Sequence, residues 1–250
     1  MSGHSKWSQI KRQKGANDAK RGAVFTKVAR EITIAAREGG SEPDANYRLR
    51  LAMEKARSVN MPADNIKRAI DRATGGSAAE QYEEIVYEGY GPGGVAILVE
   101  AATDNRNRTV ADVRSLFTRA GGQLAGAGAV AWQVEPRGVV VVPRDGQDPD
   151  DVALTAIDAG AADVDVESDP IEIVTDPGQL EAIRRVLEEQ GVTVESAELA
   201  MQPKNAIEVD ATVARQNLRL LESLEELDDV QRVTANFDLP AEILAEAAAS

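Results

Sequence analysis

Two stretches in the second half of the chain open alike and decide the fold: residues 148–160, DPDDVALTAIDAG, and residues 176–191, DPGQLEAIRRVLEEQG. Each begins with Asp-Pro, continues with apolar residues at helical spacing and ends at a glycine; in the first stretch we expect Val152, Ala156 and Ile157 to face inward. A capping aspartate, a proline in the first turn and a glycine after the end are typical of an α-helix. Strand-like runs flank both helices, at residues 139–142, 164–167, 171–175 and 192–201. The order βαββαβ predicts a ferredoxin-like domain.

An incomplete sheet precedes this unit, and its missing half follows it. The elements expected before it are strands over residues 84–90 and 95–103, a helix capped by Thr109, and a strand over residues 129–134. After residue 204 come a helix capped by Asp210, a turn at Asp228-Asp229 and a strand over 230–237, which have no neighbours of their own. We therefore expect these two groups to form one discontinuous domain with the βαββαβ unit inserted in it.

The first segment predicts a basic arm followed by three short helices, over residues 17–39, 44–59 and 62–74. Val28, Ile32 and Ala36 give the first helix a buried stripe, and its cations other than Arg21 fall roughly on the other side. We expect an α+β protein with three domains. They are residues 1–77, a basic arm and helical domain; residues 78–136 with 204–240, a discontinuous α/β domain; and residues 137–203, the inserted domain.

Charge is segregated along the chain. The net charge is −14, but residues 1–75 carry +8 and residues 76–250 carry −22. Most charge runs are merely solvated surface, but a separation by segment favours a polyanion-binding end on an acidic body. We therefore predict that the first segment binds nucleic acid.

Composition excludes several classes of protein. The chain has no cysteine and one histidine, so thiolate chemistry is excluded and a histidine metal site is not expected. No apolar run approaches the ~20 residues of a membrane span, and the start lacks an apolar signal core. We expect a cytoplasmic protein that is not an enzyme, with no cofactor, no metal, no membrane contact and no small-molecule substrate.

A glycine motif at residues 89–94, GYGPGG, matches the dinucleotide-binding pattern only as a string. That function needs a helix directly after the glycines, where the pyrophosphate meets the helix N-terminus. The residues that follow, VAILV at 95–99, are typical of a strand. We therefore interpret the motif as a hairpin turn.

The residues predicted to bind nucleic acid are His4, Lys6, Trp7, Lys11, Arg12, Lys14, Lys20, Arg21, Lys27, Arg30, Lys67, Arg68 and Arg72. Lysine and arginine would contact phosphates, and Trp7 would stack on a base. The alternative, that Trp7 packs onto the helical domain, stays open. A candidate second contact is the loop of Asn105, Arg106, Asn107 and Arg108, which otherwise serves only to cap a helix.

Several of these motifs resemble the YebC family. They are MSGHSKW at residues 1–7, DAKRG at 18–22 with Phe25, YEGYGP at 87–92, and the loop at 103–108. The resemblance covers nearly the whole chain and implies three domains, a cytoplasmic location and a role in gene expression. It offers two functions: a DNA-binding transcriptional regulator, or a ribosome-associated translation factor that relieves stalling, notably at proline-rich stretches. Mitochondrial members are translational activators of cytochrome oxidase, and the family has no catalytic residues to carry over.

The residues themselves favour RNA over DNA. No second helix of a helix-turn-helix carries polar side chains suited to reading bases. The cations are suited to phosphates, which position a protein but do not specify a sequence. We therefore favour a partner of ribosomal RNA or the ribosome, and keep promoter DNA as the alternative.

Overall fold

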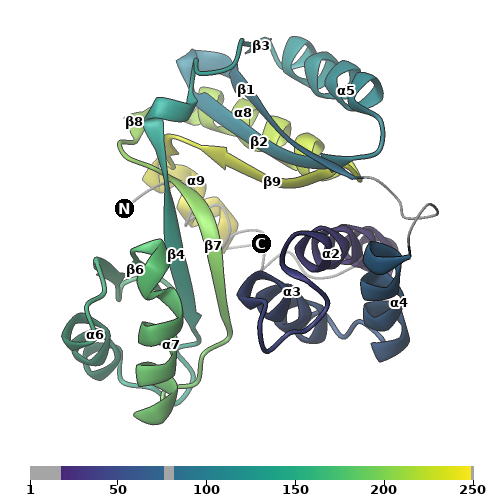
Figure 1. Cartoon of the computed structure of the whole chain (residues 1–250). Coiled ribbons are helices and arrows are strands. Elements are labelled where there is room, and N and C mark those ends of the chain that lie inside the picture. The colour runs from purple at the N-terminus through teal and green to yellow at the C-terminus, as the bar shows by residue number, and fades with distance from the viewer. Residues whose placement is uncertain (1–17, 76–81, 249–250) are drawn as a thin grey trace. The chain divides into compact units, whose positions relative to one another are not determined.

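The computed structural model describes residues 18–75 and 82–248, and the chain is α+β, as predicted (Figure 1). Three helices come first, and two four-stranded sheets with their helices follow. These residues group into two compact units. One holds the described chain up to Ala131 together with Asp210–Ala235, and the other holds Trp132–Val209 with the described chain from Asn236 onward. The division into three domains remains a prediction.

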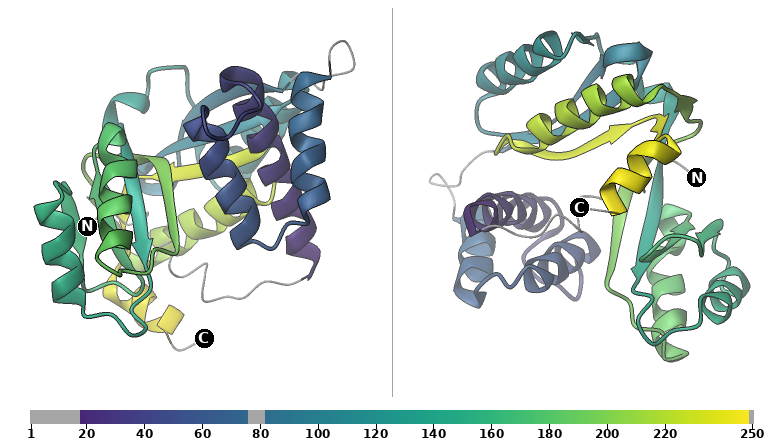
Figure 2. Two further views of the ribbon diagram at one scale, coloured as in Figure 1. Left: turned by 60° about the horizontal axis from the view of Figure 1, so that its bottom comes forward. Right: turned by 180° about the vertical axis from the view of Figure 1, so that it is seen from behind.

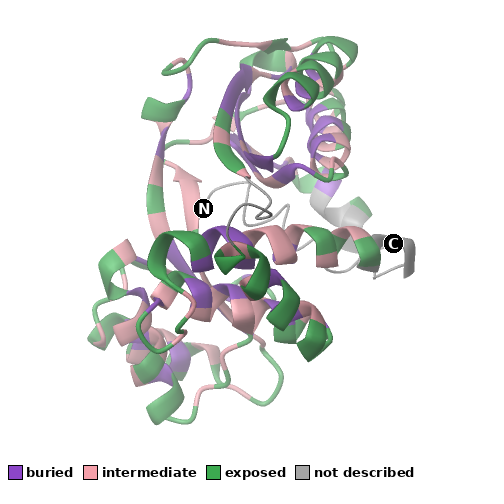
Figure 3. Ribbon diagram, turned by 45° about the vertical axis from the view of Figure 1, so that its right-hand side comes forward, coloured by how far each residue is buried: buried purple, intermediate pink, exposed green. Residues whose placement is uncertain are grey.

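The three helices are α2 (Asp18–Gly39), α3 (Tyr47–Ser58) and α4 (Ala63–Thr74). Their buried faces form one small aliphatic core, visible as the buried stretches of these helices in Figure 3. The buried members are Val28, Ile32, Ala35, Ala36, Leu49, Ala52, Ala56, Met61, Ile66 and Ala69. Because most of these side chains are small, polar contacts help to fix the helices. The Thr33 hydroxyl, for example, lies 3.0 Å from the Ala69 carbonyl and joins α2 to α4.

The first sheet has the strand order β3-β1-β2-β9, and all its neighbouring strands are antiparallel. Its strands are β1 (Glu83–Tyr90), β2 (Ala96–Thr103), β3 (Gln123–Leu124) and β9 (Val230–Ala235). Helices α5 (Arg106–Arg119) and α8 (Ala211–Glu225) pack side by side against it (Figure 2). A short 3-10 turn, Pro92–Gly94, joins β1 to β2, so the glycine motif is a hairpin turn, as predicted.

The second sheet has the order β5-β6-β4-β7, which is the ferredoxin-like arrangement. Its strands are β4 (Val134–Val142), β5 (Asp163–Asp165), β6 (Ile171–Thr175) and β7 (Ser196–Pro203). Helices α6 (Pro149–Asp158) and α7 (Leu180–Glu189) contact each other and the sheet. The same unit contains the short parallel pair β8 (Ile207–Glu208) and β10 (Phe237–Asp238), and helix α9 (Ala241–Ala248).

The strand predicted over residues 129–134 is wrong, because backbone N–H groups of this segment donate hydrogen bonds to a buried carboxylate, that of Glu88, and not to a neighbouring strand. Ala131–Gln133 is a 3-10 turn, and β4 starts at Val134. The Glu88 side chain accepts hydrogen bonds from the backbone N–H groups of Gly128, Val130 and Ala131, at 2.6, 2.5 and 2.8 Å. Burial raises the pKa of Glu88, but these three bonds outweigh it and lower the pKa below its ordinary value.

The two Asp-Pro openings differ in the structure. Asp148 caps α6 as predicted, since its side chain accepts a hydrogen bond from the Asp150 N–H at 3.0 Å. Asp176 is not a cap, which corrects the prediction. A 3-10 turn, Pro177–Gln179, precedes α7, and the Asp176 carboxylate instead accepts a hydrogen bond from Arg137 at 2.7 Å.

Ile157 of α6 is 58% exposed, although its spacing predicted an inward side chain. The buried face of α6 is set by Val152 and Ala156, which lie four residues apart. Ile157 follows Ala156 directly and is therefore rotated by about 100° from that face. Only the narrow face of α6 that carries Val152 and Ala156 is buried.

Gly138 marks the closest approach of α7 to β4. A Cβ at this position would lie 2.2 Å from the Thr175 Oγ1 and 2.9 Å from the Leu180 Cβ. We expect Gly138→Ala to lower the free energy of unfolding by about 1–3 kcal/mol, the usual cost of overpacking. Gly178→Ala is the control, because a Cβ there would meet no atom within 4 Å. Urea unfolding of both variants checks this, and equal stabilities would contradict it.

Candidate nucleic-acid interface

Part of the predicted surface cannot be placed. His4, Lys6, Trp7, Lys11, Arg12 and Lys14 lie outside the described residues, so their roles stay predictions. Lys20 and Arg21 fall in the first turns of α2, and only their backbone is described.

Helix α4 presents three of the predicted cations to solvent. Lys67, Arg68 and Arg72 are exposed, while Ile66 and Ala69 of the same helix are buried in the core. Arg68 stays close to its own helix, since its Nε donates to the Asp64 carbonyl at 3.2 Å and its guanidinium also donates to the Asn65 side chain. Among the described residues, this face is one accessible part of the predicted interface.

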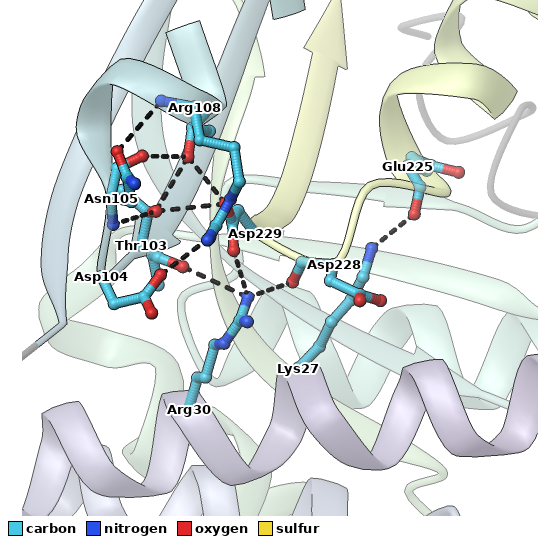
Figure 4. Close-up of polar contacts among 11 residues, drawn as sticks. Lys27, Arg30, Thr103, Asp104, Asn105, Arg108, Glu225, Asp228 and Asp229 are labelled. Atoms are coloured by element: carbon cyan, nitrogen blue, oxygen red, sulfur yellow. Dashed lines mark hydrogen bonds and ion pairs between the residues drawn. The ribbon is translucent and has the colours of Figure 1, made fainter. Parts of the chain in front are cut away.

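The two predicted cations in the middle of α2 have partners inside the protein (Figure 4). The Lys27 ammonium donates to the Glu225 carbonyl. One guanidinium nitrogen of Arg30 lies 2.5 Å from the Asp228 carbonyl and 2.9 Å from the Asp229 carboxylate. The Arg30 side chain is only 12% exposed, so it connects α2 to the loop before β9.

Asp229 is the centre of these contacts (Figure 4). One carboxylate oxygen accepts from Arg30, and the other accepts from Arg108 at 2.7 Å, Thr109 at 2.7 Å and Thr103 at 3.1 Å. The Asp229 backbone carbonyl also accepts a hydrogen bond from the Ala102 N–H at 2.8 Å. A single carboxylate, 8% exposed, therefore holds together α2, the end of β2 and the start of α5.

The charge of Asp229 is stabilised where it lies. Burial raises the pKa of this carboxyl group, but the hydrogen bonds from Arg108 and Thr109, the charge of Arg30 and the bond from Thr103 together outweigh it. The pKa of Asp229 is therefore lowered. The pKa of Arg108 is raised, chiefly by its hydrogen bonds to Asp229 and Asp104. Both groups are ionised at neutral pH.

The predicted loop contact divides into two kinds of residue. Asn105 accepts a hydrogen bond from the Arg108 N–H at 3.1 Å and caps α5, which confirms the capping interpretation. Thr109, the cap that the sequence predicted, is instead buried and donates to Asp229. Arg106 is 66% exposed and lies 3.6 Å from Glu83, and Asn107 is exposed as well.

The sequence predicted Asp229 only as part of a turn. The chain has 42 acidic residues, so one more carboxylate before a strand carries no signal of its own. The sequence also predicted Arg30 and Arg108 as surface cations. The helix period shows which face a residue occupies, but it does not show what covers that face. The ion cluster therefore becomes visible only in three dimensions.

Comparison with known proteins identifies the family. A sequence model described as "TACO1/YebC protein N-terminal domain" matches residues 5–76, and one described as "TACO1/YebC second and third domain" matches residues 82–237. Together they cover most of the chain, which belongs to the TACO1/YebC family.

Individual relatives agree with this assignment. A protein of Rubrobacter xylanophilus is 55% identical over 249 residues, covering 99% of this chain and 100% of the relative, and a protein of Chloroflexus aurantiacus is 56% identical over 248 residues, covering 98% of each. Both are named "Probable transcriptional regulatory protein". The crystal structure of a conserved hypothetical protein from Aquifex aeolicus is similar, with a TM-score of 0.86 and 45% identity over 91% of this chain and 94% of that chain. The relatives' names describe regulators rather than enzymes.

The Asp229 cluster predicts a large effect of one substitution. Asp229→Ala leaves Arg30 and Arg108 without their shared counter-charge, and we expect a loss of about 3–5 kcal/mol in the free energy of unfolding. Asp104→Ala is the control, because Asp104 also pairs with Arg108 but is 57% exposed, and it should cost less than about 1 kcal/mol. Chemical denaturation measures both. A loss at Asp229 no larger than that at Asp104 would show that the cluster is not a stabilising unit.

The same carboxylate predicts a pH dependence. Because the pKa of Asp229 is lower in the folded chain than in the unfolded one, its contribution is complete above the unfolded pKa of about 3.9 and is lost as the pH falls further. Asp229→Asn cannot ionise at this position. The difference in stability between the wild type and Asp229→Asn should therefore narrow below about pH 4. A difference that stays constant across that range would contradict the lowered pKa.

Proposed function

We propose that this chain is a non-enzymatic, cytoplasmic regulator of gene expression that binds RNA at the ribosome. Its resemblance to family members that act in translation extends the proposal to relief of stalling, for example at proline-rich stretches. The membership of the family and the names of the relatives support the wider statement that it is a regulatory protein. The narrower statement rests on the charges described next.

The observation that carries the proposal is the exposed cationic face of α4. Lys67, Arg68 and Arg72 lie in a segment of net charge +8, while residues 76–250 carry −22. Cations that contact phosphates release condensed counterions, which drives binding without reading a sequence. A cationic face on an otherwise acidic chain therefore favours contact with a polyanion at this face.

The charge of the rest of the chain favours folded RNA over a long duplex. The strongly acidic remainder, −22 over residues 76–250, would repel a duplex that runs along it. On a ribosome, the acidic part can instead face solvent or basic ribosomal proteins while a small cationic face contacts RNA.

A DNA-binding transcriptional regulator is the second candidate. The observation in its favour is the name that the relatives carry, "Probable transcriptional regulatory protein". It requires base readout, and the exposed cations of α4 are of the kind that contact phosphates.

The cationic face is tested by reversing its charges. We expect Lys67→Glu/Arg68→Glu/Arg72→Glu to weaken binding to ribosomal subunits and to lower the log–log salt slope by about 2, because each lost phosphate contact removes roughly 0.7–0.9. Arg57→Glu/Arg114→Glu/Arg185→Glu is the matched control, with the same change in net charge at exposed positions outside this face. Sedimentation with subunits over a salt series measures both. Equal losses in the two triple variants would remove α4 from the interface.

The choice between RNA and DNA is tested by direct comparison at one salt concentration. We expect tight binding to intact ribosomal subunits and weak binding to duplex DNA that does not depend on sequence. Arg106→Ala should weaken ribosome binding and leave duplex binding nearly unchanged, because the Arg106 side chain is 66% exposed in the loop at residues 105–108. A promoter duplex bound far more tightly than a scrambled one, with no ribosome association, would favour the transcriptional candidate instead.

A further inference from the structure

A hollow lies between α2 and α4, beside the exposed cations. Its volume is about 260 Å³, and we call it the α2–α4 hollow. Its apolar lining comes from Phe25, Ala29, Met61 and Ala69. Its charged and aromatic lining comes from Arg30, Arg68, Arg72 and Tyr82. A second hollow of about 310 Å³ adjoins it and shares Arg68 and Arg72.

The walls combine a flat platform with a pair of cations. The Arg30 guanidinium lies over the Tyr82 ring, 5.2 Å from its centre, and Arg30 is fixed by its bonds to Asp229. Arg68 and Arg72 are four residues apart on α4, so their side chains emerge as neighbours on one face. Like charges at this spacing repel each other and destabilise an isolated helix. An anion bound between them would turn that repulsion into a net attraction.

These walls define the chemistry of the ligand. An apolar floor next to an arginine–tyrosine platform suits a planar ring, and the arginine pair suits a phosphate. The chain's own basic arm has the wrong charge for this rim. We propose that the α2–α4 hollow holds one unpaired nucleotide of a single-stranded nucleic acid, with its base in the hollow and its phosphate at Arg68 and Arg72.

This inference rests on the proposed function and makes it more specific. The volume is close to the lower end of ligand pockets, about 300 Å³, so there is room for one base. A base inside a duplex is stacked and paired and must leave the helix before it can enter such a site. The hollow therefore selects single-stranded segments, such as the loops and bulges of a folded RNA.

The experiment measures binding of the full chain to three labelled oligonucleotides by fluorescence anisotropy: a single-stranded RNA, the single-stranded DNA of the same sequence, and the duplex of that DNA. The wild type should bind both single strands at least tenfold more tightly than the duplex. Tighter binding of RNA than of DNA supports the proposal with RNA as the ligand, and equal binding supports it through the shared base and phosphate chemistry.

Filling the hollow separates base binding from phosphate binding. Ala29→Leu should weaken single-strand binding at least tenfold while the salt slope stays unchanged, since no cation is lost. Arg68→Ala should instead lower the slope for single strands by about 0.7. Thr26→Leu fills the hollow from an exposed lining position and serves if Ala29→Leu fails to fold. Val24→Leu is the matched control, on the same helix but outside the lining.

Three results would overturn the inference. If Thr26→Leu, folded as judged by circular dichroism, binds single strands as the wild type does, the hollow holds no base, while the proposed function stands. If the wild type binds duplex and single strands equally, the hollow likewise holds no unpaired base, and the proposed function still stands. If the wild type binds an acidic, aromatic peptide, and Thr26→Leu abolishes that binding without affecting RNA binding, the hollow belongs to a protein partner. Failure of the wild type to bind either RNA or ribosomes would instead overturn the proposed function itself.

Discussion

One buried carboxylate, that of Asp229, fixes how the first helices meet the first sheet. It accepts hydrogen bonds from Arg30 of α2, Thr103 at the end of β2, and Arg108 and Thr109 of α5. A charge-assisted bond is roughly twice as strong as a neutral one, and an unpaired buried charge is costly. The junction is therefore specified by polar chemistry, whereas the helical core is specified by aliphatic packing.

The contacts around Asp229 affect which of the predicted cations are accessible to a nucleic acid. Lys27 and Arg30 point from α2 to acceptors in the same unit, and Arg108 is held between Asp104 and Asp229. A phosphate would have to displace these acceptors and leave Asp229 buried without its counter-charges. Lys67, Arg68 and Arg72 are exposed on α4, and the contacts of Arg68 are to its own helix. Net charge therefore overstates the binding surface of the described helices, because part of it is used within the fold.

Local chemistry allowed the order of elements to be predicted, and long-range contacts explain where it failed. Glycine, proline and aspartate mark helix ends through backbone preferences that act over a few residues, as at Asp148 of α6. The strand expected over residues 129–134 failed because Glu88, some 40 residues away, takes the backbone N–H groups of that segment. Thr109 is not the cap because α5 already begins at Arg106, capped by Asn105, and the Thr109 hydroxyl donates instead to Asp229, 120 residues away. No pattern of period two or 3.6 contains either contact.

Arg30 belongs both to the Asp229 cluster and to the lining of the α2–α4 hollow. Its guanidinium is held by Asp229 and lies over Tyr82, so the platform of the α2–α4 hollow is positioned by the same carboxylate that joins α2 to the sheet. Loss of that carboxylate would release the platform even though Asp229 does not line the hollow. Arg68 is instead held by its own helix, through the Asp64 carbonyl and the Asn65 side chain. A ligand that uses both walls therefore binds most tightly when α2 is docked on the sheet, and by thermodynamic linkage its binding strengthens that docking.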